Sequence, residues 1–494
     1  MASDVSRRPA IAGIGQLVQR VDDPAEAISP IEMMENAIRQ AAEDAGAPKL
    51  VEHLDGIYVP RGTWQYGNPG RLLAERLGSP NAKSITGAVS GHIVQILLNM
   101  ACREIAAGKA DVIAIVGGES ENSKRRILRG GGELHWDDTI PGEPDATVGE
   151  MKYAQNPGEK DSGVVDATSI FTFCETSLRA SLGETPSAHR DRIAELAHQM
   201  SKVAEGNPYA WIPREVSAEE IRNPSESNRM VIYPYTKLMT SNISVDQSAA
   251  LIVCSTEAAD RFGVPGGQRV FLRASTEMSK TTTLSERNEL HVHPGQVLAA
   301  QRVLERAQKN ASDLEHVDLY SCFPFAIQAG AAALGIPTDP VPSLTGGMTF
   351  FGGPFGNYVL HSKATMIDRL RKDPGSTGAI GSVGGAFAHF SYGIYSTEPI
   401  DAVLPEIEDV SDEFDAMPRR AMLQERYAGE APIESYTVLV GKEGPARLNF
   451  AAINPDGYRV WGGSTDPELM AAALSDEDLV GRNARFSEGV VTLL

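Results

Sequence analysis

Two short clusters of side chains have the types and the spacing needed to bind a ligand. The first is His291-Val292-His293. A strand would place both imidazoles on one side, where they could bind a metal ion. The sequence suggests no third ligand, however, and the alternative interpretation is a pair of loop histidines. A basic cluster in an otherwise acidic chain consists of Lys124, Arg125, Arg126 and Arg129. It could contact the phosphate of a ligand, or it could be a solvated surface. We therefore expect no metal site, and phosphate binding is a hypothesis.

Nucleophilic thiols are few and scattered. The 494 residues contain four cysteines without paired short spacings, which argues against a disulfide framework and against a thiolate zinc site. These are Cys102, Cys174, Cys254 and Cys322. The first residues include two arginines but no long apolar segment, so we expect no secretion signal. Both observations predict a cytoplasmic protein in a reducing environment.

The charge balance and the apolar pattern exclude several classes of partner. The chain has 45 Lys and Arg residues against 65 Asp and Glu residues, a formal net charge of −20, so a general nucleic-acid or anionic-membrane surface would repel its partner. No run of about 18 apolar residues could cross a bilayer. No glycine fingerprint for nucleotide phosphates follows a predicted strand. We expect no nucleic-acid partner and no membrane span.

The elements that would position reactive groups follow an alternating α/β pattern. Continuous apolar runs are typical of strands buried on both faces. The candidate strands are Ala10–Ile14, Val112–Val116, Ala249–Cys254 and Val270–Ala274. The first helix is predicted to begin at Pro30, because Ser29 and Glu32 form a capping-box pattern, and Gly46 marks its end.

Two stretches that start about 265 residues apart share one plan. Each begins with a glycine that opens a helix of about sixteen residues, and each continues through a short loop into a buried strand that ends in paired glycines. The stretches run from Gly91 to Gly118 and from Gly356 to Gly385. We infer that one α/β unit occurs twice in the chain.

Composition divides the chain into several segments. An N-terminal half is predicted over residues 1–265, with an inserted loop domain at about 123–240 that breaks the alternation with polar runs and with helices near Ser187–Glu205 and after Ser217. A second half covers 266–400, and an acidic linker covers 401–429. Residues 430–494 change to a period of two, with turn chemistry at Asn454-Pro455-Asp456-Gly457, and predict a small antiparallel β barrel.

The duplicated unit, the inserted loop domain and the short glycine motifs resemble the thiolase superfamily, in particular its sterol-carrier-protein-2-type thiolases and thiolase-like proteins. The resemblance covers about residues 8–400 and implies a thiolase fold, with βαβαββ halves in α/β/α/β/α layers. It implies Claisen condensation or thiolysis of acyl-CoA, and a homodimer, with a monomer as the alternative. The C-terminal segment has more strand character than a sterol carrier domain and looks more like an oligonucleotide/oligosaccharide-type barrel.

The nucleophile of a thiolase lies in a Cys-x-Ser-Gly motif at the start of the first central helix, where the helix dipole stabilises a thiolate. The matching residues are Ala88-Val89-Ser90-Gly91, so Ala88 takes the place of the cysteine, and a methyl group cannot accept an acyl chain. Ser90 or His92 could act as substitutes. We expect instead that Ser90 caps the helix and that His92 is a polar residue of its first turn.

The other three catalytic motifs of the family are also altered. Tyr320-Ser321-Cys322-Phe323 corresponds to His-Asp-Cys-Phe, and its Tyr320 is either a packed ring or a displaced hydrogen-bond donor. In Gly352-Gly353-Pro354, Gly353 takes the place of the histidine of Gly-His-Pro, and in Ser382-Val383-Gly384, Ser382 takes the place of the cysteine that moves the α-proton. Glycine offers no acid or base, and a serine of ordinary pKa is a poor base near neutral pH.

Some reactive groups would still lie near the pocket that the resemblance implies. Cys322 could be a relocated nucleophile with His389 as its base, or Cys322 could be a small buried hydrophobic residue and His389 a turn histidine. Lys124, Arg125 and Arg126 could hold a CoA phosphate.

We therefore predict a thiolase-like protein related to acetyl-CoA acetyltransferases that binds an acyl-CoA or acyl ligand, requires no cofactor and lacks the ordinary thiolase reaction. The alternatives are an acyltransferase or thioester hydrolase that uses Cys322, and a non-catalytic interaction scaffold.

Overall fold

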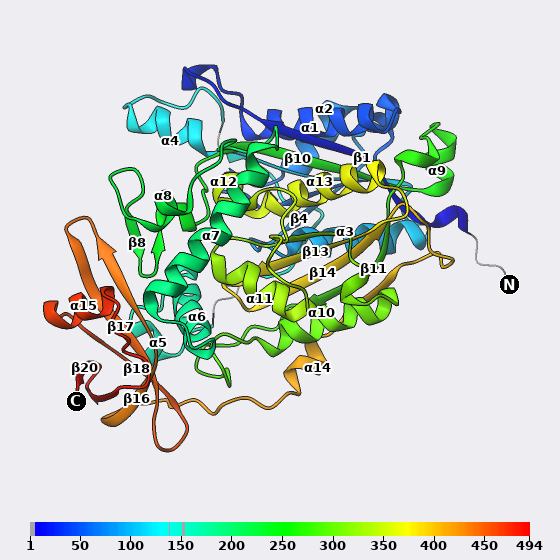
Figure 1. Cartoon of the computed structure of the whole chain (residues 1–494). Coiled ribbons are helices and arrows are strands. Elements are labelled where there is room, and N and C mark those ends of the chain that lie inside the picture. Colours follow the sequence, from blue (N-terminus) through cyan, green and yellow to red (C-terminus); the bar gives the residue numbers. More distant parts are fainter. Residues whose placement is uncertain (1–4, 138, 151–153) are drawn as a thin grey trace.

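Two sheets alternate with three layers of helices in the body of the molecule (Figure 1). The computed structural model of the chain describes residues 5–137, 139–150 and 154–494. The layered arrangement confirms the α/β/α/β/α architecture predicted from the sequence. Among the described residues, no helix is both long enough and apolar enough to pass through a bilayer.

The first sheet is built from strands of the N-terminal half, in the order β1-β10-β5-β2-β4-β7. The strands are β1 (Pro9–Val18), β10 (Asp246–Ser255), β5 (Val112–Ser120), β2 (Gly56–Pro60), β4 (Lys83–Gly87) and β7 (Ala146–Val148). Every residue of β5 and β10 is buried, because helices cover both faces of the sheet. Three of the four predicted apolar strands therefore lie in this sheet.

The second sheet has the order β12-β13-β14-β11-β15. Its strands are β12 (His316–Leu319), β13 (Thr377–Gly384), β14 (His389–Ser396), β11 (Phe271–Met278) and β15 (Glu406–Asp409). β11 contains most of the fourth predicted apolar run. β15 and the following α14 (Ser411–Asp415) lie in the segment expected to be an acidic linker. The structure differs from a plain linker here, because backbone pairing with β11 orders an acidic strand that has no apolar stripe.

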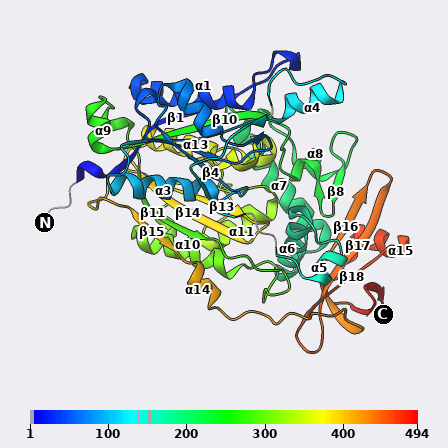
Figure 2. The ribbon, with the colours of Figure 1, turned by 180° about the vertical axis from the view of Figure 1, so that it is seen from behind.

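Two helices lie between the sheets, and the views from the front and from behind agree on this arrangement (Figures 1 and 2). They are α3 (Ile93–Ala106) and α13 (Tyr358–Lys372). α3 precedes β5 and α13 precedes β13, which are the two helix-strand units inferred from the sequence repeat. The outer helices are α1 (Pro30–Asp44) and α2 (Pro69–Leu77) on the first sheet, and α10 (Pro294–Ala307) and α11 (Pro324–Leu334) on the second.

Local sequence signals fix the ends of α1 as predicted. Ser29 Oγ accepts a hydrogen bond from the Glu32 amide, and the Glu32 carboxylate accepts one from the Ser29 amide, so the capping box is complete. Gly46, two residues after the helix ends, has a φ of 69°, a value that glycine adopts without strain.

The longest elements of the inserted segment between β5 and β10 are helices, and the segment also contributes β7 to the first sheet. Its elements are α4 (Glu121–Arg129), β6 (Thr139–Ile140), α5 (Pro157–Asp161), α6 (Ala167–Ser181), α7 (Pro186–Glu205), α8 (Ala218–Arg222), β8 (Met230–Ile232) and β9 (Tyr235–Thr236). α7 and α8 are the two helices expected from the sequence. The short elements elsewhere in the body are β3 (Gln65–Tyr66), α9 (Thr256–Arg261) and α12 (Gly347–Phe350).

Five C-terminal strands close into a ring. β16 pairs with β17 and β19, β18 pairs with β17 and β20, and β19 pairs with β20. The elements are β16 (Gly429–Gly441), β17 (Gly444–Ile453), β18 (Arg459–Ser464), α15 (Pro467–Leu474), β19 (Asn483–Ser487) and β20 (Val490–Leu493). The pairing of β18 with β20 is parallel, and the other pairings of the ring are antiparallel. The predicted turn is present, because the Gly457 amide donates to the Asn454 carbonyl at 2.9 Å.

The ring of β16 to β20 lies at one side of the body, against the inserted segment (Figures 1 and 2). Ile232 of β8 pairs with Leu439 of β16, so a short strand of the insertion extends the sheet of the ring. Ser435 Oγ also donates to the carbonyl of Phe173 in α6 at 2.7 Å. The insertion therefore joins the ring to the layered body.

Candidate functional site

A cavity of about 380 Å³ lies where the loops that carry the four altered motifs meet. One part of its lining comes from these loops: Val89, Ser90, Gly91, Tyr320, Cys322, Phe323, Gly353, Phe355, Gly356, Val383, Gly384, Gly385, Ala386 and Phe387. The other part comes from α6, from β8 and the segment before β10, and from α12: Ala167, Thr168, Phe171, Val231, Thr240, Ser241, Ile243 and Met348. The fold thus brings the separated motifs to one place.

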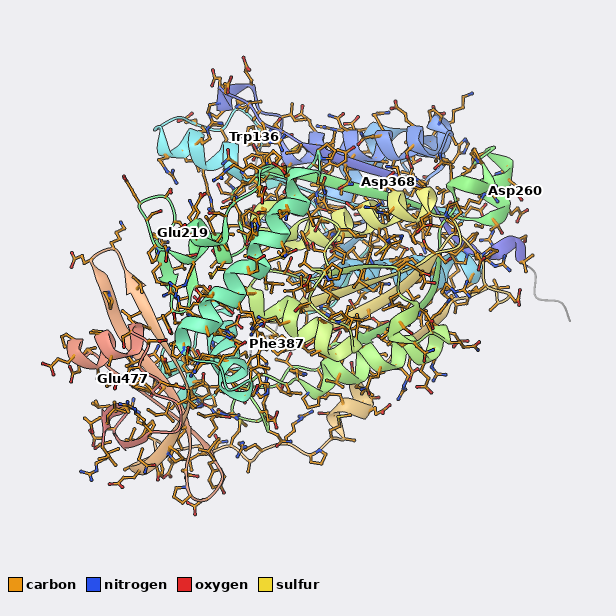
Figure 3. The ribbon with its side chains drawn as sticks, viewed as in Figure 1. Trp136, Glu219, Asp260, Asp368, Phe387 and Glu477 are labelled. Atoms are coloured by element: carbon orange, nitrogen blue, oxygen red, sulfur yellow. The ribbon has the colours of Figure 1, made fainter. Side chains whose placement is uncertain are left out.

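Aromatic rings form much of the cavity wall. The ring centroid of Phe171, in α6, lies 4.8 Å from that of Phe323 and 5.6 Å from that of Phe387. Phe387 also packs edge-on against Phe325 of α11, at 4.9 Å between ring centroids. Its label in Figure 3 marks the point where the insertion meets the second sheet and its outer helices. The wall suits an apolar ligand.

The start of α3 carries no thiol. Ala88 stands at the family position of the nucleophile, and its amide donates to the Val148 carbonyl at 2.8 Å. Cys102 lies in the same helix but is buried, and burial raises the pKa of its thiol to about 12. The side chain at the family position is therefore a methyl group, and Cys102 is a buried thiol.

Ser90 and His92 interact directly, which differs from the expectation for this helix end. Ser90 Oγ lies 2.6 Å from His92 Nδ1, and His92 Nε2 lies 3.1 Å from Ser279 Oγ. Within the part of the chain that the structure describes, no side chain caps α3, so the prediction of Ser90 as a helix cap is wrong. The cause is the buried imidazole, which competes with the helix amides for the Ser90 hydroxyl.

His92 was expected in the first turn of the helix, but it stands at the N-cap position directly before Ile93 and lies in the interior. It is 3% exposed. Burial and the neighbouring His389 lower the pKa of His92 to about 3, which keeps the imidazole neutral near physiological pH. The ring centroids of the two histidines are 5.0 Å apart.

Tyr320 closes the cavity against the start of α3. A Cβ placed on Gly91 would lie 2.5 Å from Tyr320 Oη and 2.2 Å from the Val383 carbonyl oxygen. The Tyr320 ring packs edge-on against Tyr358 of α13, with 5.7 Å between ring centroids. Tyr320 is therefore a packed ring whose hydroxyl reaches the helix start, and Gly91 is the residue that leaves room for it.

Ser241 fills space that a side chain at Gly353 would occupy. A Cβ on Gly353 would lie 2.3 Å from Ser241 Oγ. The Ser241 amide donates to the Cys322 carbonyl at 2.9 Å, which fixes the backbone of Ser241 beside the cavity. Among the described residues Ser241 Oγ has no hydrogen-bond partner, although this atom is buried. A hydroxyl donor thus stands where the family carries a histidine.

Ser382 lies behind the cavity wall. Its Oγ is 2.7 Å from Ser391 Oγ on the neighbouring strand β14, and Ser391 Oγ donates to the His92 carbonyl at 3.4 Å. Ser382 is 2% exposed, and it is not among the lining residues. Its hydroxyl therefore links two strands.

Cys322 and His389 have separate partners. Cys322 lines the cavity, but burial raises the pKa of its thiol, which opposes thiolate formation. His389 Nε2 lies 2.7 Å from Thr281 Oγ1, and burial lowers the pKa of His389 to about 4. Within the described residues no hydrogen bond joins Cys322 to His389, so the relocated thiol lacks its proposed base.

The basic cluster and the histidine pair do not form part of the cavity. Arg125 Nε donates to Glu121 at 2.6 Å, and Arg126 donates to the Val21 carbonyl at 2.7 Å. Lys124 and these two arginines are absent from the described lining of the cavity. His293 caps α10 by accepting from the Gly295 amide, and His291 Nδ1 lies 3.0 Å from Ser177 Oγ. Among the described residues no group of three potential ligands could hold a metal ion.

Two residues of the site escaped sequence reasoning. Ser241 and Ser279 lie outside the four motifs, in segments without a recognisable pattern, and only the fold brings them to Gly353 and His92. The local sequence Ser90-Gly91-His92 did offer a signal, because a serine and a histidine two residues apart can hydrogen-bond where the backbone bends into a helix.

Comparison with known proteins shows a strong likeness to a mycobacterial protein and more distant likenesses to thiolases. A monomeric SCP2-thiolase-like protein type 1 from Mycobacterium smegmatis has a solved structure that is 30% identical, covers 99% of each chain and gives a TM-score of 0.82. The peroxisomal thiolase of Saccharomyces cerevisiae shares the fold at 13% identity, over 80% of this chain and 98% of its own, with a TM-score of 0.56.

Among curated proteins, an acetyl-CoA acetyltransferase of Methanothermobacter thermautotrophicus is 23% identical over 374 residues, which are 70% of this chain and 86% of the relative. No protein-family model matches the chain. The likeness to the mycobacterial protein extends through both halves and the C-terminal ring, so it exceeds a shared architecture. We conclude that the chain belongs to the thiolase superfamily.

Proposed function

We propose that the protein binds an acyl ligand of the acyl-CoA class in the cavity and does not catalyse the thiolase reaction. The observation that carries this proposal is the cavity itself, about 380 Å³ in volume, at the meeting point of the four family motifs. Its aromatic wall of Phe171, Phe323 and Phe387 matches the apolar chain of an acyl group. The acetyl-CoA acetyltransferase relative supports the ligand class.

The side chains at the family positions support the loss of thiolysis. That reaction needs a nucleophile to carry the acyl group and a base to move the α-proton. Ala88 and Gly353 have no functional group, Ser382 is hydrogen-bonded behind the wall, and the Cys322 thiol has a raised pKa. Loss of nucleophile and base together removes the double-displacement path.

Two measurements test the proposal. Calorimetric titration with acetyl-CoA and with a longer acyl-CoA should show one binding site, and acetoacetyl-CoA with free CoA should show no thiolysis above background. Ala167→Phe would fill the cavity from the first turn of α6 and should abolish binding. Ala218→Phe is its matched control, because Ala218 is also half-buried at the first position of a helix but lies outside the cavity.

The outcomes separate the alternatives. Thiolysis at an ordinary enzymatic rate would refute the proposal that the protein does not catalyse the thiolase reaction. Absence of binding by both acyl-CoA ligands would refute the ligand class and favour an interaction scaffold. Equal loss of binding in Ala167→Phe and Ala218→Phe would show that the cavity is not where the ligand binds.

We also propose that the chain is a monomer in solution. The resemblance to thiolases alone would predict a homodimer, but the mycobacterial relative that matches along the whole chain is described as monomeric. Light scattering coupled to size-exclusion chromatography should give the mass of one chain. A mass of two chains that persists when the protein is diluted would refute the proposal of a monomer.

A further inference from the structure

We propose that Ser90 Oγ is an acyl-accepting nucleophile and that His92 is its general base, so that the cavity hydrolyses an activated carboxylic ester or thioester through an acyl-serine. This inference rests on the proposed acyl site and adds a reaction to it. In this reaction the Ser90 hydroxyl takes the role of the thiol that is missing at Ala88, two residues earlier in the chain.

The geometry between the two side chains is that of a nucleophile and its base. Ser90 Oγ and His92 Nδ1 are 2.6 Å apart, within the range for proton transfer. Ser279 Oγ lies 3.1 Å from His92 Nε2 on the opposite side of the ring. If Nε2–H donates to Ser279, Nδ1 keeps its lone pair for the Ser90 hydroxyl, and this assignment satisfies both contacts.

The cavity gives a substrate access to Ser90. Ser90 lines it, together with the apolar wall that would hold an acyl chain. Gly384 faces the pair, and a Cβ at this position would lie 1.9 Å from Ser90 Oγ and 2.6 Å from His92 Nδ1. The glycine therefore leaves the space in which the pair forms. The start of α3 follows directly, and its positive end favours the negative charge that develops during acyl transfer.

Two buried polar atoms at this wall lack a partner among the described residues, as expected of groups that await a ligand. One is Ser241 Oγ, which lines the cavity beside Gly353 and could donate to a developing oxyanion. The other is Nδ1 of His389, whose ring lies beside His92 and under Gly385. Most buried polar groups in folded proteins are hydrogen-bonded, so these two atoms are available to a bound ligand.

The reaction uses only the bound ester and water. Ser90 Oγ attacks the carbonyl carbon while its proton passes to His92 Nδ1. The bond from carbon to the leaving sulfur or oxygen then breaks, and the leaving group takes that proton. In the second half, water gives a proton to His92 and attacks the acyl-serine, the ester bond to Ser90 breaks, and Ser90 recovers the proton.

Burial of His92 makes it a weak base, because the pKa of the imidazole falls to about 3. Proton transfer is most efficient when the pKa of the base lies near the working pH. No carboxylate is hydrogen-bonded to His92 among the described residues to stabilise its protonated form. We therefore expect both the acylation of Ser90 and the hydrolysis of the acyl-serine to be slow.

The test uses an alkyl fluorophosphonate, which forms a stable bond with an activated serine and releases fluoride. Peptide mass spectrometry of the full-length protein should locate the adduct on Ser90. Ser90→Ala should abolish labelling, and His92→Asn should lower its rate by about 100-fold, since it removes the base and keeps a small polar side chain.

The chain provides a matched control in a second serine-histidine pair outside the cavity. Ser177 Oγ lies 3.0 Å from His291 Nδ1, and Ser177→Ala should leave labelling unchanged. A circular dichroism melt of each variant checks that it is folded. A modified residue other than Ser90, or equal labelling of wild type and Ser90→Ala, would overturn the inference.

Ligand titration separates this inference from the proposed function. If an acyl-CoA binds while Ser90 stays unmodified by the fluorophosphonate, the nucleophile is refuted and the binding site stands. If Ser90 is modified while no acyl-CoA binds, the nucleophile is supported and the CoA-type ligand is refuted.

Discussion

Lys363 of α13 donates a hydrogen bond to Gln95 of α3, and this contact joins the two central helices in the middle of the molecule. Lys363 Nζ also donates to Tyr395 Oη at 2.5 Å, and Lys363 is fully buried. Burial lowers the pKa of Lys363 to about 7 from its usual value near 10.5. Between these two pH values the unfolded chain holds a proton that the folded protein releases.

The first prediction concerns this buried amine. From pH 7 to pH 10 the Lys363 amine should contribute a rise in the free energy of unfolding of the wild type relative to Lys363→Met, because in that window the unfolded chain protonates this amine and the folded protein does not. Lys363→Met should remove this rise and should stabilise the protein at pH 7 by about 1–3 kcal/mol, since Gln95 Oε1 keeps its hydrogen bond from Tyr395 at 2.6 Å. Urea titrations at several pH values measure both effects.

The control for Lys363 lies on the same helix. Lys372 is exposed and paired with Asp368, so Lys372→Met should change stability by about 0–1 kcal/mol and should leave the pH dependence intact. A pH-independent difference between Lys363→Met and the wild type would contradict a buried amine that titrates near neutral pH.

The second prediction concerns the close approach at the start of α3. Gly91→Ala should destabilise the protein by about 2 kcal/mol or more, because its Cβ would lie 2.2 Å from a backbone oxygen that cannot move aside cheaply. Gly206→Ala is the control: Gly206 caps the end of α7 with a φ of −81°, and a Cβ there would make only ordinary contact with the Val203 carbonyl oxygen at 3.7 Å, so this change should be neutral or slightly stabilising. Urea unfolding compares the two variants. Equal free energies of unfolding would refute the prediction that Gly91 has no room for a Cβ.

The third prediction concerns the contact between the C-terminal ring and the body. Arg459 of β18 is buried, pairs with Glu434 at 2.6 Å, and donates to the carbonyls of Leu284 and Arg287 at 2.6 and 2.7 Å. Arg459→Ala should cost about 3 kcal/mol and should increase trypsin cleavage in the segment before β16, because the carbonyls and Glu434 lose a shared partner.

An exposed ion pair of the same ring provides the comparison for Arg459. Arg485 and Glu430 are 2.7 Å apart, with side chains 60% and 54% exposed, so Arg485→Ala should cost about 0–1 kcal/mol and should leave cleavage unchanged. If Arg459→Ala and Arg485→Ala were cleaved at the same rate, Arg459 would not be the residue that attaches the ring to the body.

The fourth prediction concerns thiol reactivity. The four native cysteines are buried, so iodoacetamide should modify them slowly in the folded protein. Ala88→Cys should add one faster-reacting thiol in the loop between β4 and α3, because Ala88 is only half-buried, but it should not restore thiolysis, because Gly353 and Ser382 still lack the other functional groups. Peptide mapping after timed alkylation measures this, and fast modification of Cys322 in the wild type would revive it as a relocated nucleophile.

Local signals predicted much of the fold. Ser29, Glu32 and Gly46 defined α1, because capping depends on neighbours in sequence, and continuous apolar runs identified β5 and β10. β15 was not predicted, because its order depends on pairing with β11 and not on its own composition.

Only part of the site could be predicted, because the rest depends on contacts between residues that are distant in sequence. Motif positions such as Ala88 and Gly353 can be recognised along the chain, and the fold brings their loops to one cavity. The hydrogen bond between Ser90 and His92 depends on the burial of the imidazole, and the role of Ser241 depends on a contact with a residue more than a hundred positions away.

The pairing of β8 with β16 has a consequence for how the molecule transmits force. Val231 of β8 faces the cavity, and its neighbour Ile232 is bonded to Leu439 in the C-terminal ring. A displacement of β16 would therefore reach the cavity wall through two adjacent residues, Ile232 and Val231.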